Sequence, residues 1–196
     1  MLLLNETLHA TPPKTLRVLE LGSGCGIVGI TLAQAVPNCH VLLTDMPEAA
    51  DIAQRNIAEA VPATRSLHSQ VSFEVLDWEK PLPQSVQSKL LDIILVSECI
   101  YNPDSIPALV RTLAALLNRS PKAIIVVSTK VRHSSEAVFF DLMAKTRLVI
   151  GEHTSLPLPG DGGWNVDEPE QVGVYIFHHR DRQVVAAAPN SRDRCA

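Results

Sequence analysis

The sequence predicts an α/β fold with a doubly wound, mostly parallel seven-stranded sheet and an antiparallel final strand. Short apolar runs of strand length alternate with segments of helical periodicity along most of the 196 residues, as in a sheet with helices on both faces. A Gly-rich turn follows the first run, at residues 22–26. The last two predicted strands have no helix between them, so they can pair antiparallel, because parallel neighbours need a crossover.

The first predicted elements surround the Gly-rich turn. Residues 16–21 form a short apolar run bounded by prolines and glycine, which suits a strand buried on both faces. A helix is expected from about residue 26 to residue 35, closed by Pro37. Residues 40–45 form the second buried strand.

The same order continues through the middle of the chain. Pro47 lies in the first turn of a helix that is expected to run to about residue 61. Residues 71–78, 90–97 and 123–128 are the next three predicted strands. Leucines at helical spacing between the last two of these strands predict an amphipathic helix that packs on the sheet.

The end of the chain departs from this order. Residues 135–147 form another amphipathic helix, with Val138 among its inward-facing side chains. The strands 148–154 and 172–177 follow with only a loop between them. The sequence therefore predicts one domain over residues 1–181, and a disordered tail over residues 182–196, which have no periodicity.

Composition argues against several classes of protein. The formal net charge of −4 leaves no broad basic field for nucleic acid. The four cysteines form no C-x-x-C pair, so neither a metal site nor a disulfide framework is predicted. No apolar run is long enough to cross a membrane. We expect a soluble, monomeric protein of the cytoplasm, with the nucleus as a second location.

The Gly-rich turn permits more than one cofactor. Residues 24–29 fit G-x-G-x-x-G, and Asp45 follows at the distance expected of a ribose-binding acid, which is the pattern of a NAD site. Glu20, directly before the turn, instead favours a cofactor that carries a sulfonium and an ammonium, because a carboxylate opposes a pyrophosphate. Gly22 lengthens the loop around a compact amino-acid group. These residues favour S-adenosylmethionine, with NAD and a ligand-free turn as alternatives.

Four motifs in order carry a resemblance to a known family. Residues 18–29 look like motif I of the seven-strand methyltransferases, which are Rossmann-like enzymes that use S-adenosylmethionine. Residues 44–49, with Asn56 behind them, resemble methyltransferase family 16 more narrowly. Asp77-Trp78 is similar to the family's adenine-contacting pair, and residues 98–101 stand where the family usually has D-x-x-Y. Characterised members largely methylate lysine in other proteins, and in one case histidine.

The resemblance implies a cofactor site. Asp45 would accept hydrogen bonds from both ribose hydroxyls, and Asp77 would accept from the adenine amino group. Trp78 would offer its ring and Met46 would line the adenine side, although both can also be core packing. The residues implied to bind the cofactor are Glu20, Gly22, Ser23, Gly24, Gly26, Asp45, Met46, Asp77, Trp78 and Ser97.

The resemblance also implies an acceptor site at Glu98 and Tyr101. An acidic group can orient a lysine ammonium, and Tyr101 would supply an aromatic wall. Glu98 is one methylene longer than the family's usual aspartate, and a surface acid is its alternative reading. Cys99 lacks a partner histidine nearby, so we expect a small buried thiol and not a nucleophile.

Together these motifs predict an S-adenosylmethionine-dependent methyltransferase that acts on a lysine of a protein substrate. Family members usually have an upstream segment that covers the cofactor, whereas only residues 1–14 precede the first strand here. The resemblance thus implies that this N-terminal segment is missing. The alternatives are an inactive methyltransferase-like binding subunit and a NAD-dependent oxidoreductase.

Overall fold

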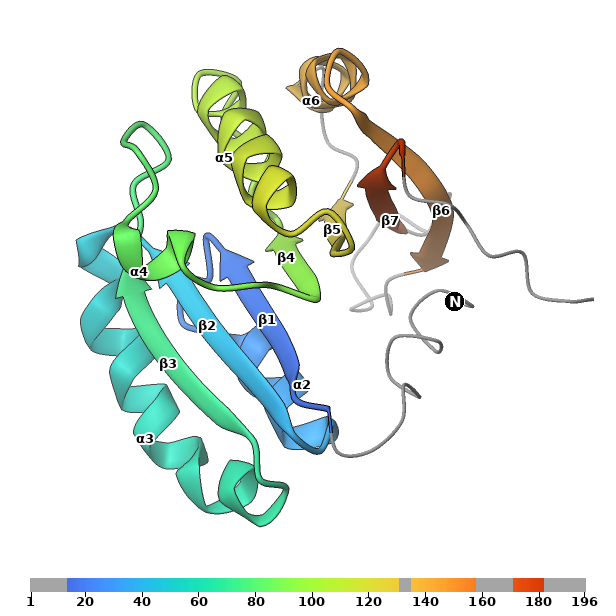
Figure 1. Cartoon of the computed structure of the whole chain (residues 1–196). Helices are drawn as coiled ribbons and strands as arrows, with labels where there is room; N and C mark the ends of the chain where they lie inside the picture. The colour runs from blue at the N-terminus through green and yellow to red at the C-terminus, as the bar shows by residue number, and fades with distance from the viewer. Residues whose placement is uncertain (1–13, 131–134, 158–170, 182–196) are drawn as a thin grey trace, which may run out of the picture.

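The computed structural model describes residues 14–130, 135–157 and 171–181, which form one seven-stranded sheet in the order β3-β2-β1-β4-β5-β7-β6 (Figure 1). Neighbours among the first five strands are parallel, and β7 is antiparallel to both β5 and β6. The predicted fold class, including the antiparallel final strand, is confirmed. The strands are β1 (Leu16–Leu21), β2 (Cys39–Asp45), β3 (Gln70–Val75), β4 (Ile93–Ser97), β5 (Ile124–Lys130), β6 (Leu148–Pro157) and β7 (Gln171–His179).

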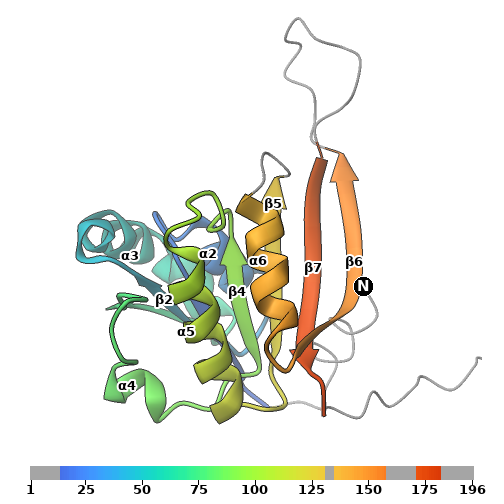
Figure 2. The same ribbon diagram turned by 90° about the horizontal axis from the view of Figure 1, so that it is seen from above.

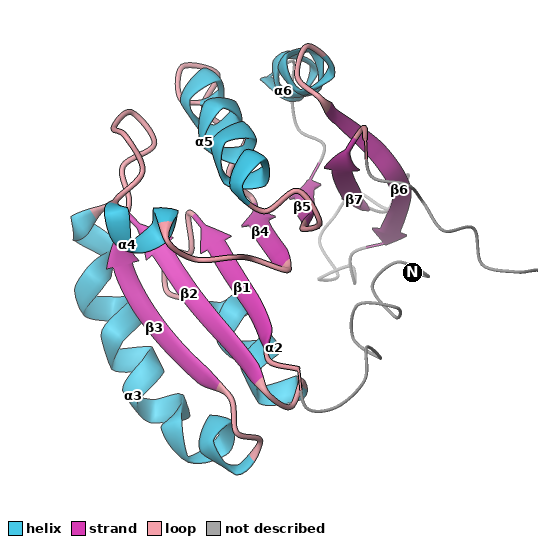
Figure 3. Ribbon diagram, in the orientation of Figure 1, coloured by secondary structure: helices cyan, strands magenta, loops and turns pink. Residues whose placement is uncertain are grey.

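Helices cover both faces of the sheet, as Figures 2 and 3 show. α2 and α3 lie on one face, and α4, α5 and α6 lie on the other (Figure 1). Each face has its own buried apolar cluster, and alternate residues of β1 and β2 contribute to one cluster or the other. The helical elements are α2 (Ile27–Ala35), the 3₁₀ turn η1 (Pro47–Ala49), α3 (Ala50–Ser66), α4 (Gln84–Gln87), α5 (Ile106–Arg119) and α6 (Ser135–Ala144).

The strand order reverses between β1 and β4. The chain builds outward from β1 through β2 to β3 and then crosses back to place β4 on the other side of β1. In open parallel sheets, ligands bind beyond the carboxyl ends of the strands at such a reversal. The fold thus places the loops after β1 and β4 next to each other at the position where a ligand is expected.

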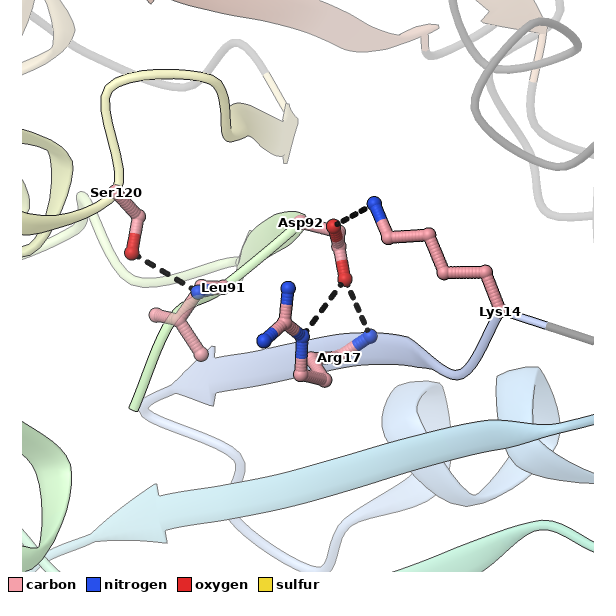
Figure 4. A network of polar contacts seen from close by, with 5 residues as sticks. All are labelled: Lys14, Arg17, Leu91, Asp92 and Ser120. Carbon is pink, nitrogen blue, oxygen red and sulfur yellow. Dashed lines mark hydrogen bonds and ion pairs between the residues drawn. The ribbon is translucent and has the colours of Figure 1, made fainter. Parts of the chain in front are cut away.

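At the amino ends of the strands, opposite the predicted site, Asp92 connects β1 to the start of β4, as Figure 4 shows. Its carboxylate accepts hydrogen bonds from the Arg17 N–H at 2.9 Å and from Arg17 Nε at 3.2 Å, and Lys14 Nζ lies 3.2 Å away. The pKa of Asp92 is lowered, because these bonds from Arg17 and Lys14 together outweigh the effect of burial. Beside it, the Leu91 N–H donates to Ser120 Oγ at 2.9 Å. These bonds join β1, β4 and the end of α5 away from the predicted site.

Several predicted boundaries are wrong. The helix after Pro47 begins as a 3₁₀ turn and then continues as α3 to Ser66, past the expected end near residue 61. Pro62 lies inside α3, on its exposed side. A proline there removes one hydrogen bond, but the buried Ala60 and Thr64 on either side of it hold the last turns against the sheet.

At the other elements the differences are smaller. β3 ends at Val75 and not at residue 78, because the Leu76 N–H bonds the Asp45 carbonyl and the chain then turns. α6 ends at Ala144, and β6 is three residues longer than expected. Val138 is 40 % exposed and does not face inward. The predicted disordered tail at residues 182–196 lies outside the described residues.

Candidate functional site

The predicted site residues gather at the carboxyl edge of four neighbouring strands. The Gly-rich loop follows β1, Asp45 ends β2, and Asp77 lies two residues beyond β3. Ser97 ends β4, and Glu98 follows it. Because β3, β2, β1 and β4 are consecutive in the sheet, their ends form one continuous row.

The Gly-rich loop turns sharply between β1 and α2. Gly22 has φ +64°, and a Cβ on it would lie 2.5 Å from Cys99 Sγ and 3.2 Å from Trp78 Cζ2. Only glycine fits there, because both the backbone angle and the space exclude a side chain. Gly24, with φ +53°, differs in that a Cβ on it would meet nothing within 4 Å. The loop is therefore packed tightly beneath Gly22 and open at Gly24.

Ser23 lies between these two glycines and carries an unsatisfied hydroxyl. The residue is 6 % exposed, and its N–H donates to the Thr44 carbonyl at 3.0 Å. Among the buried side-chain nitrogen and oxygen atoms of the described residues, only Ser23 Oγ lacks a hydrogen-bond partner. Such an atom is costly unless a ligand or water completes it. The loop thus fits a ligand that carries polar groups.

Glu20 lies beneath the loop. It is 2 % exposed, and its Oε2 accepts a hydrogen bond from the Gly29 N–H at 2.9 Å. Burial raises the pKa of Glu20 to about 7; the Gly29 hydrogen bond opposes this rise and the nearby Asp45 carboxylate adds to it. The side chain therefore ties β1 to α2. Its predicted contact with the cofactor stays a prediction.

Asp45 joins the loops after β1 and β2. Its Oδ2 accepts from the Gly24 N–H at 2.7 Å, and its Oδ1 accepts from the Met46 N–H at 2.7 Å. A carboxylate has about four acceptor positions, so two bonds leave capacity for a vicinal diol. Met46 is 43 % exposed beside it. The geometry is compatible with the predicted ribose contact, and it adds a structural role at Gly24 that the sequence did not suggest.

Asp77 and Trp78 follow β3, the strand that pairs with β2, which ends at Asp45. Asp77 Oδ1 accepts from the Glu79 N–H at 2.9 Å, and Oδ2 lies 3.1 Å from Lys80 Nζ. The Glu79 hydrogen bond, followed by Lys80, lowers the pKa of Asp77. Trp78 packs against the apolar cluster on the α5 face and also lies over Gly22. The two readings of Trp78 are thus compatible, because the ring is both core packing and a wall of the loop.

Glu98 begins the segment after β4 in an uncommon backbone conformation, with φ +55°. Its N–H donates to the Ser128 carbonyl at 2.9 Å, and its Oε1 accepts from the Lys130 N–H at 2.6 Å. Its side chain is exposed at the carboxyl edge. Tyr101 is 77 % exposed, so its ring is not packed as a wall of the site within the described residues.

Four further residues support the site. Thr44 is fully buried and donates from Oγ1 to the Glu20 carbonyl at 2.6 Å. Asn56 Nδ2 donates to the Cys25 carbonyl at 2.8 Å, which anchors the loop to α3. Ser128 Oγ donates to Ser97 Oγ at 2.9 Å. Cys99 is 5 % exposed, and burial raises the pKa of its thiol to about 12, which confirms the expected buried thiol.

The sequence pointed to Thr44 and Asn56, because Thr44 begins the family motif at residues 44–49 and Asn56 follows that motif. Ser128 carried no such signal, because its contact depends on the pairing of β4 with β5.

The described residues contain neither a cluster of metal ligands nor a helix that could span a membrane. No three His, Cys, Asp or Glu side chains converge as a metal ion requires anywhere in ranges 14–130, 135–157 and 171–181. Within these ranges, every helix is too short or too polar to cross a membrane.

Residues 2–146 match the sequence model of a protein family described as lysine methyltransferase. The chain is 32 % identical over 126 residues to protein N-lysine methyltransferase METTL21A of Xenopus tropicalis, covering 64 % of this chain and 54 % of the relative. It is 30 % identical over 173 residues to EEF1A lysine methyltransferase 3 of Mus musculus, covering 87 % and 64 %. The chain spans about half the length of the curated relatives that it matches.

Solved structures show the same fold. A methyltransferase described as S-adenosylmethionine-dependent, from Methanosarcina mazei, matches with a TM-score of 0.64 and 13 % identity over 90 % of this chain and 96 % of its own. The magnesium protoporphyrin IX methyltransferase of Synechocystis, solved with bound S-adenosylmethionine, matches with a TM-score of 0.58 and 15 % identity over 90 % and 76 %.

Proposed function

Because the chain belongs to the lysine methyltransferase family, we propose that it transfers a methyl group from S-adenosylmethionine to the side-chain amine of a lysine in another protein. The observation that carries the proposal is the Gly-rich loop, where the unsatisfied Ser23 hydroxyl lies next to the open backbone of Gly24. Asp45 bonds that same backbone and provides a carboxylate for a diol.

The residues around the loop would hold the two ends of the cofactor. Ser23 and the N–H groups of Ile27 and Val28 at the start of α2 would bind its amino-acid end, since Gly26 caps that helix without a side-chain hydrogen bond and the Gly29 N–H already donates to Glu20. Asp45 would hold the ribose, and Asp77 with Trp78 would hold the adenine. Bound S-adenosylmethionine would supply an electrophilic methyl group on a sulfonium; an amine would attack the methyl carbon in line with the C–S bond, and S-adenosylhomocysteine would be the leaving group.

Glu98 would attract and orient the acceptor lysine. Its exposed carboxylate stands one residue beyond β4, and the Lys130 N–H fixes its position. In-line attack needs a neutral amine aligned with the methyl carbon, so the lysine ammonium must first lose its proton to water. Tyr101 would border the same acceptor side and would have to move onto the substrate, since it is 77 % exposed in the unbound chain.

The partner would be a protein and not a nucleic acid, and we propose a monomer acting in the cytoplasm, with the nucleus as a second location. The choice of acceptor follows the names of two relatives, from mouse and Xenopus tropicalis, which are EEF1A lysine methyltransferases. EEF1A is thus the first acceptor to test, and a histidine acceptor is the chemical alternative.

The test is transfer of a tritiated methyl group from S-adenosylmethionine by the full chain, with purified EEF1A and a cell lysate as acceptors. We expect label in protein, and methyl-lysine after acid hydrolysis. Label in methyl-histidine would correct the acceptor. Measurable NADH binding without S-adenosylmethionine binding would overturn the proposal.

An inactive binding subunit is the second candidate, and the exposure of Tyr101 is the observation that favours it. That candidate predicts that calorimetry detects the cofactor, weakly or not at all, and that no acceptor in either preparation is labelled.

A further inference from the structure

Cys99 touches both halves of the proposed site from below. Its Sγ lies 3.3 Å from the Leu21 carbonyl oxygen and 3.7 Å from the Gly22 carbonyl oxygen, which belong to the end of β1 and the loop. The same sulfur lies 3.2 Å from the Ser97 carbonyl oxygen at the end of β4. One small thiol therefore bridges the cofactor loop and the segment that begins with Glu98.

The space around this thiol is filled. A Cβ on Gly22 would lie 2.5 Å from Cys99 Sγ and 3.2 Å from Trp78 Cζ2, so these two side chains already occupy the space next to Gly22. The loop therefore rests directly on Cys99 and Trp78. A larger side chain at residue 99 would collide with Gly22 or Trp78, and a smaller one would leave a cavity into which the loop can relax.

The backbone of Glu98 makes this arrangement possible. A glutamate with positive φ is uncommon and strained, and here the turn sends two neighbouring side chains apart. The Glu98 carboxylate accepts from the Lys130 N–H at the end of β5, while the Cys99 side chain packs against the loop after β1. Contacts at both residues are therefore needed to hold the strained turn, and Cys99 supplies those on the loop side.

We propose that Cys99 is a positioning residue that sets the distance between the Gly-rich cofactor loop and the Glu98–Tyr101 acceptor segment. It acts through these two segments and touches no reacting atom. The role rests on the proposed methyl transfer, in which the donor carbon and the acceptor nitrogen must align closely, so that a shift of about 1 Å can cost about a hundredfold in rate.

The thiol serves here as a neutral donor and space-filling group. Its pKa is raised to about 12, first by burial and then by the carboxylates of Asp45, Glu20 and Glu98. The S–H therefore stays protonated at physiological pH and keeps donating to the carbonyl oxygens around it.

The experiment compares Cys99→Ala with Cys39→Ala. Cys39 is also a buried thiol, 0 % exposed, but it begins β2 at the opposite edge and belongs to the other apolar cluster. Cys99→Ser, which keeps a donor on a smaller atom, is the rescue variant and also serves if Cys99→Ala does not fold. Amide hydrogen exchange of the unliganded chains is followed at Ser23 and Glu98, whose N–H groups bond Thr44 and Ser128.

We expect Cys99→Ala to speed exchange at the amides of Ser23 and Glu98, and Cys99→Ser to restore part of their protection. Cys39→Ala should leave exchange at these two amides slow, whatever it does to the rest of the chain. With saturating cofactor and acceptor, Cys99→Ala should lower kcat about tenfold or more while cofactor KM changes less. Equal effects of Cys99→Ala and Cys39→Ala on exchange, or an effect on only one of the two amides, would overturn the proposal.

The two proposals fail in different ways. A wild-type chain that binds no S-adenosylhomocysteine and transfers no methyl group overturns the methyltransferase function, and the exchange measurements still decide whether Cys99 couples the segments. An active wild type whose kcat is unchanged by Cys99→Ala overturns the positioning role alone.

Discussion

At the scale of single residues, three of the four carboxylates of the site, those of Glu20, Asp45 and Glu98, lie in different surroundings. Glu20 is buried under the loop with a raised pKa, Asp45 accepts from two backbone N–H groups, and Glu98 is exposed beyond β4. Burial and hydrogen bonding act in opposite directions on a carboxylate, since burial disfavours the charge and N–H donors favour it. The same chemical group can therefore serve as a structural tie, a ligand for hydroxyls and an attractor of an ammonium.

Asp45→Ala should weaken cofactor binding by about 1–3 kcal/mol, the cost of leaving polar partners without a bond. The variant loses an acceptor for the ribose and also frees the Gly24 N–H, so the loop itself loosens. Calorimetric titration with S-adenosylhomocysteine measures the effect. Asp51→Ala, which removes an exposed carboxylate from α3, is the control; equal affinity of Asp45→Ala and wild type would contradict the assignment.

Unlike Asp45→Ala, Glu98→Ala should leave cofactor affinity unchanged and lower the rate of methyl transfer. The carboxylate accepts from the Lys130 N–H at the end of β5, whereas the Gly-rich loop follows β1, two strands away in the sheet. Titration and tritium transfer are measured on the same preparation, with Glu98→Gln to separate charge from the hydrogen bond. A loss of cofactor affinity at unchanged turnover would refute the acceptor role.

The pKa of Glu20 predicts how stability depends on pH. The pKa is raised from 4.5 to about 7, so between these values the folded chain holds a proton that the unfolded chain has lost. The stabilisation from this proton is complete below pH 4.5 and is lost as pH rises through 7, with a size of about 3 kcal/mol.

Glu20→Gln should remove this pH dependence, because a glutamine oxygen can still accept from the Gly29 N–H. Urea unfolding at pH 5 and pH 8 tests it, with the exposed Glu59→Gln as the control for loss of one acidic group. If wild type and Glu20→Gln lose stability equally between these two pH values, the raised pKa is refuted.

The positions of the site residues could be predicted, but their bonds could not. Glu20 and Asp45 were recognisable from their places before the Gly-rich turn and at the end of the next strand, and Asp77 and Glu98 from their resemblance to the motifs of a known family; parallel strands bring the four together. The bond from Gly24 to Asp45 depends on a loop with three positive φ angles, and nothing in the spacing reveals which N–H will turn toward the carboxylate.

At the scale of elements, α3 shows that packing overrides a local signal. The helix was expected to end near residue 61, yet it continues through Pro62 to Ser66, although the proline ring opposes the preceding turn. Ala60 and Thr64 are buried against the sheet, and Thr64 Oγ1 lies 3.3 Å from the Ala60 carbonyl oxygen and 3.2 Å from that of Val61. Strands were easier to predict than helix ends, because a buried strand is an uninterrupted apolar run whereas tertiary contacts decide where a helix stops.

Pro62→Ala should therefore stabilise the chain by about 2–3 kcal/mol. A proline inside a helix costs about 3 kcal/mol relative to alanine, and part of this is offset because proline also restricts the unfolded chain. Urea unfolding measures the change. Pro83→Ala at the start of α4 is the matched control; it should destabilise by about 0.4–1 kcal/mol, since there only the restriction of the unfolded chain is lost. A destabilised Pro62→Ala variant would show that the proline is needed.

At the scale of the whole molecule, the site belongs to the sheet and not to one loop. The groups proposed to hold the cofactor stand at the ends of β1, β2 and β3, and those proposed for the acceptor follow β4. The alternation of strands and helices predicted this doubly wound plan, and the missing crossover predicted the antiparallel β7. The insertion of β7 between β5 and β6 was not predicted, because the pairing of β7 with β5 depends on contacts between residues far apart in sequence.

A ligand that bridges several strands should stabilise the whole domain against unfolding. At a hundredfold excess over its Kd, S-adenosylhomocysteine should add about 2.7 kcal/mol and raise the midpoint of thermal unfolding by about 5–10 °C. NADH at the same concentration should leave the midpoint unchanged at pH 8, where Glu20, whose pKa is about 7, is ionised and opposes a pyrophosphate at the loop. Differential scanning calorimetry of the full chain with each ligand decides between them, and Asp45→Ala should reduce the shift caused by S-adenosylhomocysteine. A larger shift with NADH would favour a nicotinamide cofactor, since only a ligand that binds the folded chain more tightly than the unfolded chain can raise the midpoint.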